Sequence, residues 1–496
     1  MSDSYYITTP IYYVNDEPHI GHAYTTILAD VLSRYYRNIG TNTFFLTGLD
    51  EHGQKVQQAA ENRGIDSQLH CDEMAPRFID LWKKLHISNN DFIRTTESRH
   101  KKIVQLILQQ VMDKGDIYVA EYEGLYSVSE ERFITEKEAE SGQYRGIKSL
   151  KEKNYFFKMS KYQKRLINHI NSNPKFIQPE HRKNEILGFL RKPLNDLCIS
   201  RPKTRLSWGI ELPFDKNYVT YVWFDALINY VSAIGFGNDI NNFNKWWPAS
   251  CHLIGKDILT THAVYWPTML FSANLPLPTS IFAHGWWLMG DSKMSKSLGN
   301  VISPIDLIDD YGVDSVRYYL MREMVLGQDS SFTIDSFIKR YNSDLANDLG
   351  NLLSRVSTLI KKNYDGIIPP MHPKYINYSL GEKSHTIVEE VDMLMKKMRL
   401  NEAIESIMEF IRSVNKYMEN NAPWKLVKED KEKAGHILYI AAEALRLSAV
   451  LLSPIMPNQT LKLLNVLNAK ESGLKWGELK HGVRLNQHTS LFPRIK

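Results

Sequence analysis

The stretch from residue 10 to residue 22 joins a strand to a helix, and this junction constrains the fold of the whole chain. Tyr5 to Tyr13 is rich in aromatic and β-branched side chains, which favours a β-strand. From Ile20 to Tyr35 apolar residues recur at three- and four-residue intervals, which predicts an amphipathic helix, and Gly40 is suited to end it. A second β-rich run, Thr43 to Thr47, follows, as in a parallel α/β sheet with helical crossovers.

Two histidines, His19 and His22, lie at the start of the predicted helix. Unpaired backbone N–H groups and the positive end of the helix dipole gather at such a start and favour a phosphate group there. Gly21 has no side chain, so a flat ligand can lie directly on the backbone. The same residues also fit a simpler interpretation, in which two surface histidines only cap the helix. This motif by itself leaves both interpretations open.

A basic stretch, Lys293 to Ser297, begins 274 positions after His19. Alone, such a stretch is usually a solvated turn. Together, the two stretches resemble the HIGH and KMSKS signatures of class I aminoacyl-tRNA synthetases in residue type, order and spacing. The resemblance implies that ATP and an amino acid form an aminoacyl-adenylate, with catalysis by positioning and electrostatic stabilisation. It assigns the contacts with the phosphates and the transition-state charge to four catalytic residues: His19, His22, Lys293 and Lys296.

Composition limits the remaining possibilities. The chain of 496 residues is 43% hydrophobic and 24% charged, as expected for a globular protein of about two to four domains. It has no apolar run of 18 or more residues and no signal-peptide or transit segment, so we expect no membrane span and a cytoplasmic location. The cysteines, Cys71, Cys198 and Cys251, are far apart, which is typical of a reducing compartment. The net charge of +5 permits a polyanionic partner without requiring one.

The order of predicted elements indicates an α/β fold, a Rossmann-like parallel sheet split by a connective-peptide insertion. Asp50 to Gly53 and the 10–22 stretch both follow strands, and ligands of parallel sheets lie at the carboxyl ends of strands, so the two segments are predicted to share a crevice. The sheet is predicted to resume at Tyr218 to Trp223, with later strands ending near Gly255 and His284. The dinucleotide fingerprint Gly-x-Gly-x-x-Gly is absent, which argues against a dehydrogenase.

The predicted insertion, residues 117 to 214, alternates short β-like runs with charged segments. Many methionyl-tRNA synthetases carry a zinc knuckle of Cys-x-x-Cys pairs in this region, and Val128 to Phe133 resembles its surroundings without any cysteine. We therefore expect no structural zinc, with Arg/Glu pairs or plain packing in its place. Residues 161 to 205 hold eleven Lys or Arg against three Asp or Glu, which suits either a solvated basic face or a surface for an RNA acceptor end.

The remainder of the chain is predicted to form an α-helical anticodon-binding bundle. Apolar residues at three-to-four spacing indicate helices near 349–362, 384–399, 401–420, 432–453 and 457–468. The expected domains are a catalytic domain in two halves (1–116 and 215–291), the insertion (117–214), a KMSKS loop with a stem-contact segment (292–347) and the bundle (348–496).

Further segments narrow the resemblance to the methionyl-tRNA synthetase family over nearly the whole chain. They are Thr9–His22, Gly48–Gly53, Val222–Tyr230, Gly255–His262, His284–Gly299 and Asn421–Trp424. The isoleucyl, valyl and leucyl enzymes insert a large editing domain between the two signatures, for which 274 positions leave no room. The cysteinyl enzyme needs a zinc site that this chain cannot build. A long, polarisable thioether packs well against aromatic side chains, which fits these segments.

The resemblance implies a methionine site of eight residues: Ile11, Tyr13, Asp50, Trp223, Ala226, Tyr230, Ile258 and His262. Asp50 would pair with the substrate ammonium group. Alternatively, Trp223 and Tyr230 are ordinary residues of the hydrophobic core. Leu227 departs from the family pattern, because some members have proline at this position. ATP is expected to contact Tyr12, His19, Gly21, His22, His284, Gly285, Trp286 and Lys296. Mg²⁺ is expected to be held mainly by phosphates and water.

For tRNA, the resemblance assigns anticodon recognition to Asn351 and Arg355, one helical turn apart, and to Trp424. Alternatively, Asn351 is an ordinary residue of a helix surface, and Trp424 only anchors the start of a helix. The expected partners are methionine, ATP and the elongator and initiator methionine tRNAs, and the enzyme is expected to be a monomer. A paralogue that has lost charging and a nucleotidyltransferase with the same sheet are the rival hypotheses. The intact signature residues argue against a paralogue that has lost charging. The bundle with Trp424 argues against a nucleotidyltransferase.

Overall fold

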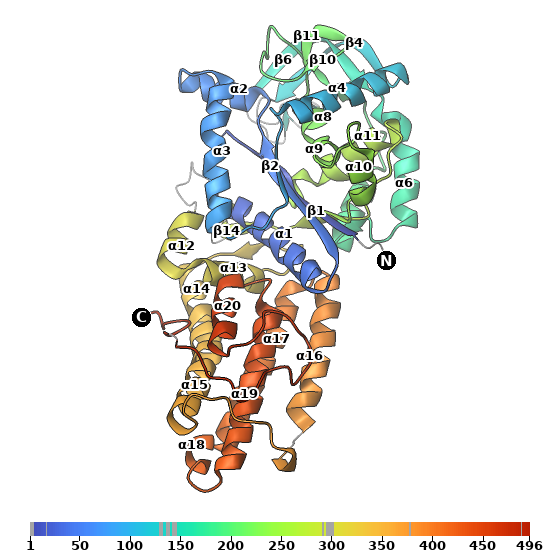
Figure 1. Cartoon of the computed structure of the whole chain (residues 1–496). Helices are drawn as coiled ribbons and strands as arrows, with labels where there is room; N and C mark the ends of the chain where they lie inside the picture. The colour runs from blue at the N-terminus through green and yellow to red at the C-terminus, as the bar shows by residue number, and fades with distance from the viewer. Residues whose placement is uncertain are drawn as a thin grey trace. The chain divides into compact units, whose positions relative to one another are not determined.

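The computed structural model describes residues 4–15, 17–127, 132–134, 139–140, 146–289, 292–293, 302–375, 378–487 and 489–496. The chain forms two compact units. The first comprises Met1–Pro18, Thr41–Lys83 and Ile87–His284, and the second comprises His19–Gly40, Lys84–His86 and Gly285–Lys496. The first is built on a parallel sheet and the second on helices (Figure 1).

The core of the first unit is a six-stranded parallel sheet in the order β3-β2-β1-β12-β13-β7. Its strands are β1 (Ser4–Tyr13), β2 (Asn42–Asp50), β3 (Asp91–Arg94), β7 (Ile177–Gln178), β12 (Cys251–Gly255) and β13 (Ile281–His284). β1 lies between β2, which follows it in the chain, and β12, which comes after the insertion. The strand order therefore reverses at β1, and ligands of open parallel sheets bind at such a reversal. The Rossmann-like fold class is confirmed.

Helices α2 (Gln54–Asn62), α3 (Ser67–Lys84) and α4 (Ser98–Asp113) connect the first strands to the insertion. The ring of Tyr12 in β1 stacks on Phe78 of α3 at 6.3 Å and meets Trp82 edge-on at 5.5 Å. In β2, a side chain at Gly48 would lie 2.1 Å from the carbonyl oxygen of Ile93, so only glycine permits β2 and β3 to approach this closely. These contacts pack the carboxyl end of β1 against α3 and the carboxyl end of β2 against β3.

The prediction that the parallel sheet resumes at Tyr218 to Trp223 is wrong. Strand β11 (Asp215–Thr220) belongs to a separate antiparallel sheet with β9 (Ser200–Pro202) and β10 (Glu211–Leu212), and Val222 already begins helix α8 (Val222–Ala226). The side-chain pattern indicates a strand but carries no information about which sheet it joins. Strands β3 and β7 were not predicted because runs of four and two residues are too short for a periodic signal.

The insertion contains a long two-stranded ribbon where short runs were expected. Strands β4 (Ile117–Ser127) and β6 (Ile147–Phe157) pair antiparallel along all eleven residues, with β5 (Arg132–Ile134) and β8 (Leu197–Cys198) at the two edges. Charged residues do not interrupt the ribbon because they form cross-strand pairs, such as Lys151 with Glu121 and Glu123 at 3.9 and 3.6 Å. Helices α6 (Gln163–Ser172) and α7 (Glu180–Phe189) follow in the basic segment.

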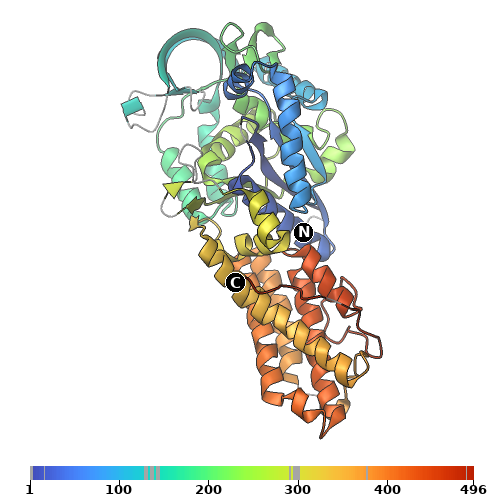
Figure 2. The same ribbon diagram turned by 90° about the vertical axis from the view of Figure 1, so that its left-hand side faces the viewer.

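The second unit is helical, as predicted, and α16, α17 and α19 pack against one another in it (Figures 1 and 2). Its longer helices are α1 (Ile20–Asn38), α12 (Pro304–Tyr311), α13 (Val313–Glu323), α15 (Asn351–Asn363), α16 (Tyr378–Lys396), α17 (Leu400–Asn421), α19 (Lys431–Leu452) and α20 (Pro457–Val466). Within this unit, Arg317 of α13 pairs with Asp30 of α1 at 2.7 Å, and both side chains are fully buried. Arg317 also donates to three backbone carbonyls, so each of its guanidinium nitrogens has a hydrogen-bond partner.

One helix of the described chain, α19, is long and apolar enough to cross a membrane by length and composition. The whole of that apolar window is buried inside the protein, as in the core helix of a bundle.

Candidate active site

In the first unit, the predicted methionine residues gather at the carboxyl ends of β1, β2 and β12. Tyr13 and Asp50 are neighbours in the β1–β2 register, and both strands end there. Trp223 and Ala226 lie on α8, Tyr230 lies on the short helix α9 (Asn229–Ser232), and Ile258 and His262 follow β12. Ile11, Trp223 and Ile258 are partly buried against the hydrophobic cluster that contains Tyr230. Segments far apart in sequence therefore converge on the predicted side of the sheet.

Hydrogen bonds fix the protonation of His262. Its Nδ1 lies 3.0 Å from the carbonyl oxygen of Ile258, which can only accept, so Nδ1 carries the proton. Nε2 then accepts from the hydroxyl of Tyr230 at 2.8 Å. Burial lowers the pKa of His262 to about 4, so the ring is neutral near pH 7. Trp223 meets the same ring edge-on at 6.3 Å, which leaves an uncharged aromatic wall suited to a thioether.

The buried neutral His262 makes stability depend on pH. The unfolded chain binds a proton at this residue near the ordinary histidine pKa of 6.5, whereas in the folded chain burial holds that pKa at about 4. The contribution of His262 to the free energy of unfolding is therefore fully present above pH 6.5. It is lost as the pH falls towards 4, by about 1.4 kcal/mol per pH unit. In urea unfolding across this range, His262→Gln should flatten the slope. His181→Gln, at an exposed histidine, is the control and should leave the dependence of stability on pH unchanged. If that dependence is unchanged in His262→Gln but altered in His181→Gln, the assignment of a buried neutral ring to His262 is wrong.

At the start of α1, in the second unit, His19 and His22 cap the helix reciprocally. The Gly21 N–H donates to Nδ1 of His19 at 3.1 Å, and the His19 N–H donates to Nδ1 of His22 at 3.3 Å. Because both Nδ1 atoms accept, each neutral ring carries its proton on Nε2. Burial and the neighbouring His19 hold the pKa of His22 well below its usual value. A side chain at Gly21 would lie 2.9 Å from the His19 ring, which accounts for the glycine.

Helix capping and phosphate binding, the two interpretations of His19 and His22, are therefore compatible. The rings stack at 3.8 Å, use Nδ1 for the cap and hold the proton on Nε2, where it can be donated to an anion.

The other residues predicted to contact ATP are distributed over both units. His284 ends β13 in the first unit and is 5% exposed. In the second unit, a side chain at Gly285 would overlap the backbone of Gln328, and the Trp286 N–H donates to Asp329 at 2.8 Å. The ring of Tyr12 is packed against Phe78 and Trp82 in the first unit and is 5% exposed, and the predicted contact of Tyr12 with ATP stays a prediction. Lys293 lies in the short strand β15 (Ser292–Lys293), and Lys296 lies outside the described residues.

The predicted anticodon residues converge in the second unit. Asn351 and Arg355 lie one turn apart on α15, and Trp424 lies on the short helix α18 (Pro423–Leu426). The guanidinium of Arg355 lies 5.3 Å from the centre of the Trp424 ring, within cation–π distance. Trp424 is 38% exposed although it is a large apolar side chain. An exposed indole beside a guanidinium is suited to stack a single-stranded base.

A buried network that sequence reasoning missed lies beside the methionine residues. Asp225 of α8 accepts a hydrogen bond from His52, which follows β2, and another from His100 of α4, both at 2.7 Å. His52 and Asp225 fall within segments that carry the family resemblance, but a single sequence gives no sign that they pair across 173 positions. His100 carries no such signal, because it looks like any polar residue of an amphipathic helix.

Among the described residues, no group of three or more His, Cys, Asp or Glu side chains could hold a metal ion. Of the segment Val128 to Phe133, which resembles the surroundings of a zinc knuckle, residues 128–131 lie outside the described residues, and so do the nearby residues 135–138 and 141–145. The expectation of no structural zinc therefore stays a prediction. None of the three cysteines is in a disulfide.

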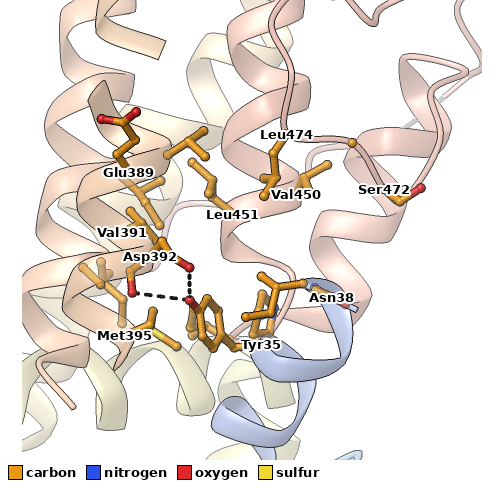
Figure 3. A pocket seen from close by; sticks show the side chains of 18 of the residues that line it. Tyr35, Asn38, Glu389, Val391, Asp392, Met395, Val450, Leu451, Ser472 and Leu474 are labelled. Atoms are coloured by element: carbon orange, nitrogen blue, oxygen red, sulfur yellow. Dashed lines mark hydrogen bonds between the residues drawn. The ribbon is translucent and has the colours of Figure 1, made fainter. Parts of the chain in front are cut away.

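The second unit also contains a cavity of about 260 Å³ that none of the predicted site residues line (Figure 3). It lies between α1, α16, α17, the end of α19 and residues 471–474. At its edge the hydroxyl of Tyr35 donates to a carboxylate oxygen of Asp392 at 2.5 Å, which ties the end of α1 to α16.

Tyr35→Phe removes this hydrogen bond without removing the ring. Because the acceptor is charged, we expect a loss of about 1.5–3 kcal/mol in the free energy of unfolding, measured in urea. Tyr311→Phe, at a half-exposed tyrosine of α12, is the matched control and should change stability by less than about 0.5 kcal/mol. Equal effects of the two substitutions would show that the contact with Asp392 contributes nothing specific.

The sheet, its strand-end residues and the helical unit that follows define a class I aminoacyl-tRNA synthetase. The family model described as "tRNA synthetases class I (M)" matches residues 5–143 and 137–357, and the "Anticodon binding domain of methionyl tRNA ligase" matches residues 375–494. The chain belongs to the methionyl-tRNA ligase family and is an aminoacyl-tRNA ligase.

Curated relatives and solved structures agree over the full length. The methionine–tRNA ligase of Rickettsia conorii is 44% identical over 512 residues, with 100% of both chains covered. That of Fusobacterium nucleatum is 46% identical, with 100% of this chain and 80% of the relative covered. The Mycobacterium tuberculosis methionyl-tRNA synthetase in complex with methionyl-adenylate is 38% identical with a TM-score of 0.95, covering 99% and 100% of the two chains. The apo form of the same enzyme is 35% identical with a TM-score of 0.87, and the match covers 100% of this chain and 99% of the other.

Proposed function

We propose that this chain joins methionine to its tRNA in two steps and that the residues described above carry them. Ile11, Tyr13, Asp50, Trp223, Ala226, Tyr230, Ile258 and His262 bind methionine. Tyr12, His19, Gly21, His22, His284, Gly285, Trp286 and Lys296 bind ATP, and His19, His22, Lys293 and Lys296 are catalytic. The convergence of the neutral His262, Tyr230 and Trp223 at the strand ends is the observation that carries the proposal.

In the first step a carboxylate oxygen of methionine attacks the α-phosphorus of ATP. A new O–P bond forms, the bond from the α-phosphorus to the bridging oxygen breaks, and pyrophosphate leaves with that electron pair. Negative charge develops on the phosphates, so donors fixed in advance lower the barrier. The capped rings of His19 and His22 have this character, since their Nδ1 atoms accept from the backbone.

The methionine pocket selects its substrate by charge and by shape. Asp50 is buried to 4% exposure, so a carboxylate there favours the substrate ammonium strongly. The side chain meets aromatic rings and an imidazole that stays neutral at physiological pH because burial lowers its pKa. A flexible thioether fits such a wall, whereas a charged side chain would lose its hydration without a partner.

In the second step a hydroxyl of the terminal ribose of tRNA attacks the carbonyl carbon of methionyl-AMP, and AMP leaves. Asn351, Arg355 and Trp424 recognise the anticodon of elongator and initiator methionine tRNAs, with Trp424 stacking a splayed base. The basic segment at residues 161–205 contacts the acceptor end. The proposed domain ranges remain 1–116, 117–214, 215–291, 292–347 and 348–496. Two pairings cross them, because β7 of the range 117–214 joins the parallel sheet and β11 of the range 215–291 pairs with β9 and β10.

Trp424→Ala should reduce tRNA charging far more than methionine activation. Loss of one stacked base costs about 1–3 kcal/mol, which predicts a fall of about 5- to 150-fold in kcat/KM for tRNA. Methionine-dependent pyrophosphate exchange should change by less than about twofold, because no tRNA takes part in it. Aminoacylation with purified methionine tRNA and exchange assays measure the two quantities.

Met393→Ala is the matched control, since Met393 is also an apolar side chain of the helical unit and is 43% exposed. The Met393→Ala variant should charge tRNA with the same kcat/KM as the wild type. If Trp424→Ala lowers exchange and charging by the same factor, the anticodon role is wrong.

Magnesium enters with ATP and is held mainly by phosphate oxygens and water. The enzyme works as a cytoplasmic monomer without structural zinc. Sedimentation of the pure protein tests the monomer, and elemental analysis after dialysis tests the zinc.

A further inference from the structure

A fully buried carboxylate, Asp225, hydrogen-bonds two histidines from different parts of the first unit. Its Oδ2 lies 2.7 Å from Nδ1 of His52 and its Oδ1 lies 2.7 Å from Nε2 of His100. The exposed fractions of the three residues are 0%, 2% and 0%, in the order Asp225, His52 and His100. Burial by itself raises the pKa of Asp225, but the two histidines lower it to about 2. The carboxylate is therefore ionised and both ring nitrogens donate to it.

This network connects three segments that carry the proposed methionine residues. Asp225 lies between Trp223 and Ala226 on α8. His52 comes two positions after Asp50, where β2 has ended. His100 continues the network to the hydroxyl of Ser232 at 2.8 Å, and Ser232 lies on α9 with Tyr230.

A second set of contacts holds the backbone beside His52. The indole N–H of Trp208 donates to the carbonyl oxygen of Glu51 at 2.6 Å, and its ring lies 5.3 Å from that of His52. The Glu51 N–H donates to the hydroxyl of Thr95 at 2.9 Å. The backbone from Asp50 to His52 is therefore held from both sides as one rigid segment, in which His52 and Asp50 keep a fixed position relative to each other.

We propose that Asp225 is a positioning residue for methionine. Through His52 it sets the place of Asp50, which meets the substrate ammonium, and through its own helix and His100 it sets Trp223 and Tyr230, which meet the side chain. The inference rests on the proposed function of those residues. A misplacement of about 1 Å at such a site can cost about 100-fold, which is why a residue without substrate contact can matter.

Asp225→Asn keeps the shape but turns an acceptor into an amide donor that faces a ring N–H. We expect it to raise KM for methionine in pyrophosphate exchange by about tenfold or more, with KM for ATP changed by less than about twofold. A second pair of variants separates hydrogen bonding from packing. His52→Ala should raise KM for methionine similarly, and His52→Asn should restore most of the loss because its amide can donate from the Nδ1 position.

Asp116→Asn is the matched control. Asp116 is equally buried and also accepts several hydrogen bonds, from Lys161, Tyr162 and Ser272, but none of these belongs to the methionine set. It should lower the melting temperature as Asp225→Asn does while leaving KM for methionine unchanged.

The proposal is overturned if KM for methionine is unchanged in folded Asp225→Asn, or rises equally in Asp116→Asn. If Asp225→Asn does not fold, the His52 pair decides, and equal KM values for His52→Ala and His52→Asn overturn it. A wild-type enzyme without methionine-dependent exchange defeats the proposed function instead, so the two failures are distinguishable.

Discussion

His22→Asn is expected to lower kcat for methionine-dependent pyrophosphate exchange by about 10²–10³-fold, the usual cost of removing one fixed donor from a developing negative charge. Asparagine can still accept the backbone N–H of His19, so the helix cap survives. It lacks a donor at the position of Nε2, which is the atom proposed to meet the phosphates. KM for methionine should change little, because that substrate is bound by other residues.

His22→Gln is the informative partner of this variant. Its longer side chain places an amide N–H near the position of Nε2, so it should recover part of the lost kcat. Circular dichroism and thermal melting check that both proteins fold alike. Equal activity of the wild type and His22→Asn would show that His22 only caps the helix, as the simpler interpretation holds.

Asp50→Asn is expected to reduce kcat/KM for methionine by about 30-fold to several thousand-fold. Removing one partner of a buried, hydrogen-bonded charge pair costs about 2–5 kcal/mol, and Asp50 is 4% exposed. Asparagine has nearly the shape of aspartate, so the substitution removes the charge with little change in packing at the strand ends, where Tyr13 and Asp50 are neighbours in the β1–β2 register. Steady-state exchange kinetics at varied methionine and saturating ATP give the ratio.

A substrate analogue identifies the group that Asp50 recognises. 4-(Methylthio)butanoate has the methionine side chain and carboxylate but no ammonium group. As a competitive inhibitor it should bind the wild type and Asp50→Asn equally well, whereas methionine should bind the variant much more weakly. If the substitution weakens both ligands by the same factor, Asp50 does not pair with the ammonium.

Long periodic elements of this fold were readable from the sequence. α1 and the bundle helices lie within a few residues of their predicted bounds because each has a clear apolar stripe, except that α16 begins six residues earlier than predicted. The strand-to-helix order alone was enough to place Asp50 and Gly255 at strand ends. The three anticodon residues were predicted as a set, and the 5.3 Å contact of Arg355 with Trp424 places two of them together.

Features that depend on contacts between distant residues could not be read from one sequence. The sheet to which β11 belongs is decided by pairing with Ser200–Pro202, which side-chain alternation does not encode. The same holds for the Asp225 network, whose members come from three segments. The reciprocal cap of His19 and His22 needs ring orientations, and those follow from the backbone of the turn and from the missing side chain at Gly21.

Amino-acid-dependent exchange of labelled pyrophosphate into ATP, measured with each proteinogenic amino acid in turn, tests whether this chain activates methionine. We expect exchange with methionine, no comparable exchange with any other amino acid, and loss of the signal in His22→Asn and Asp50→Asn. Exchange with none of them, or equally good exchange with an amino acid that carries a charged side chain, would contradict this expectation.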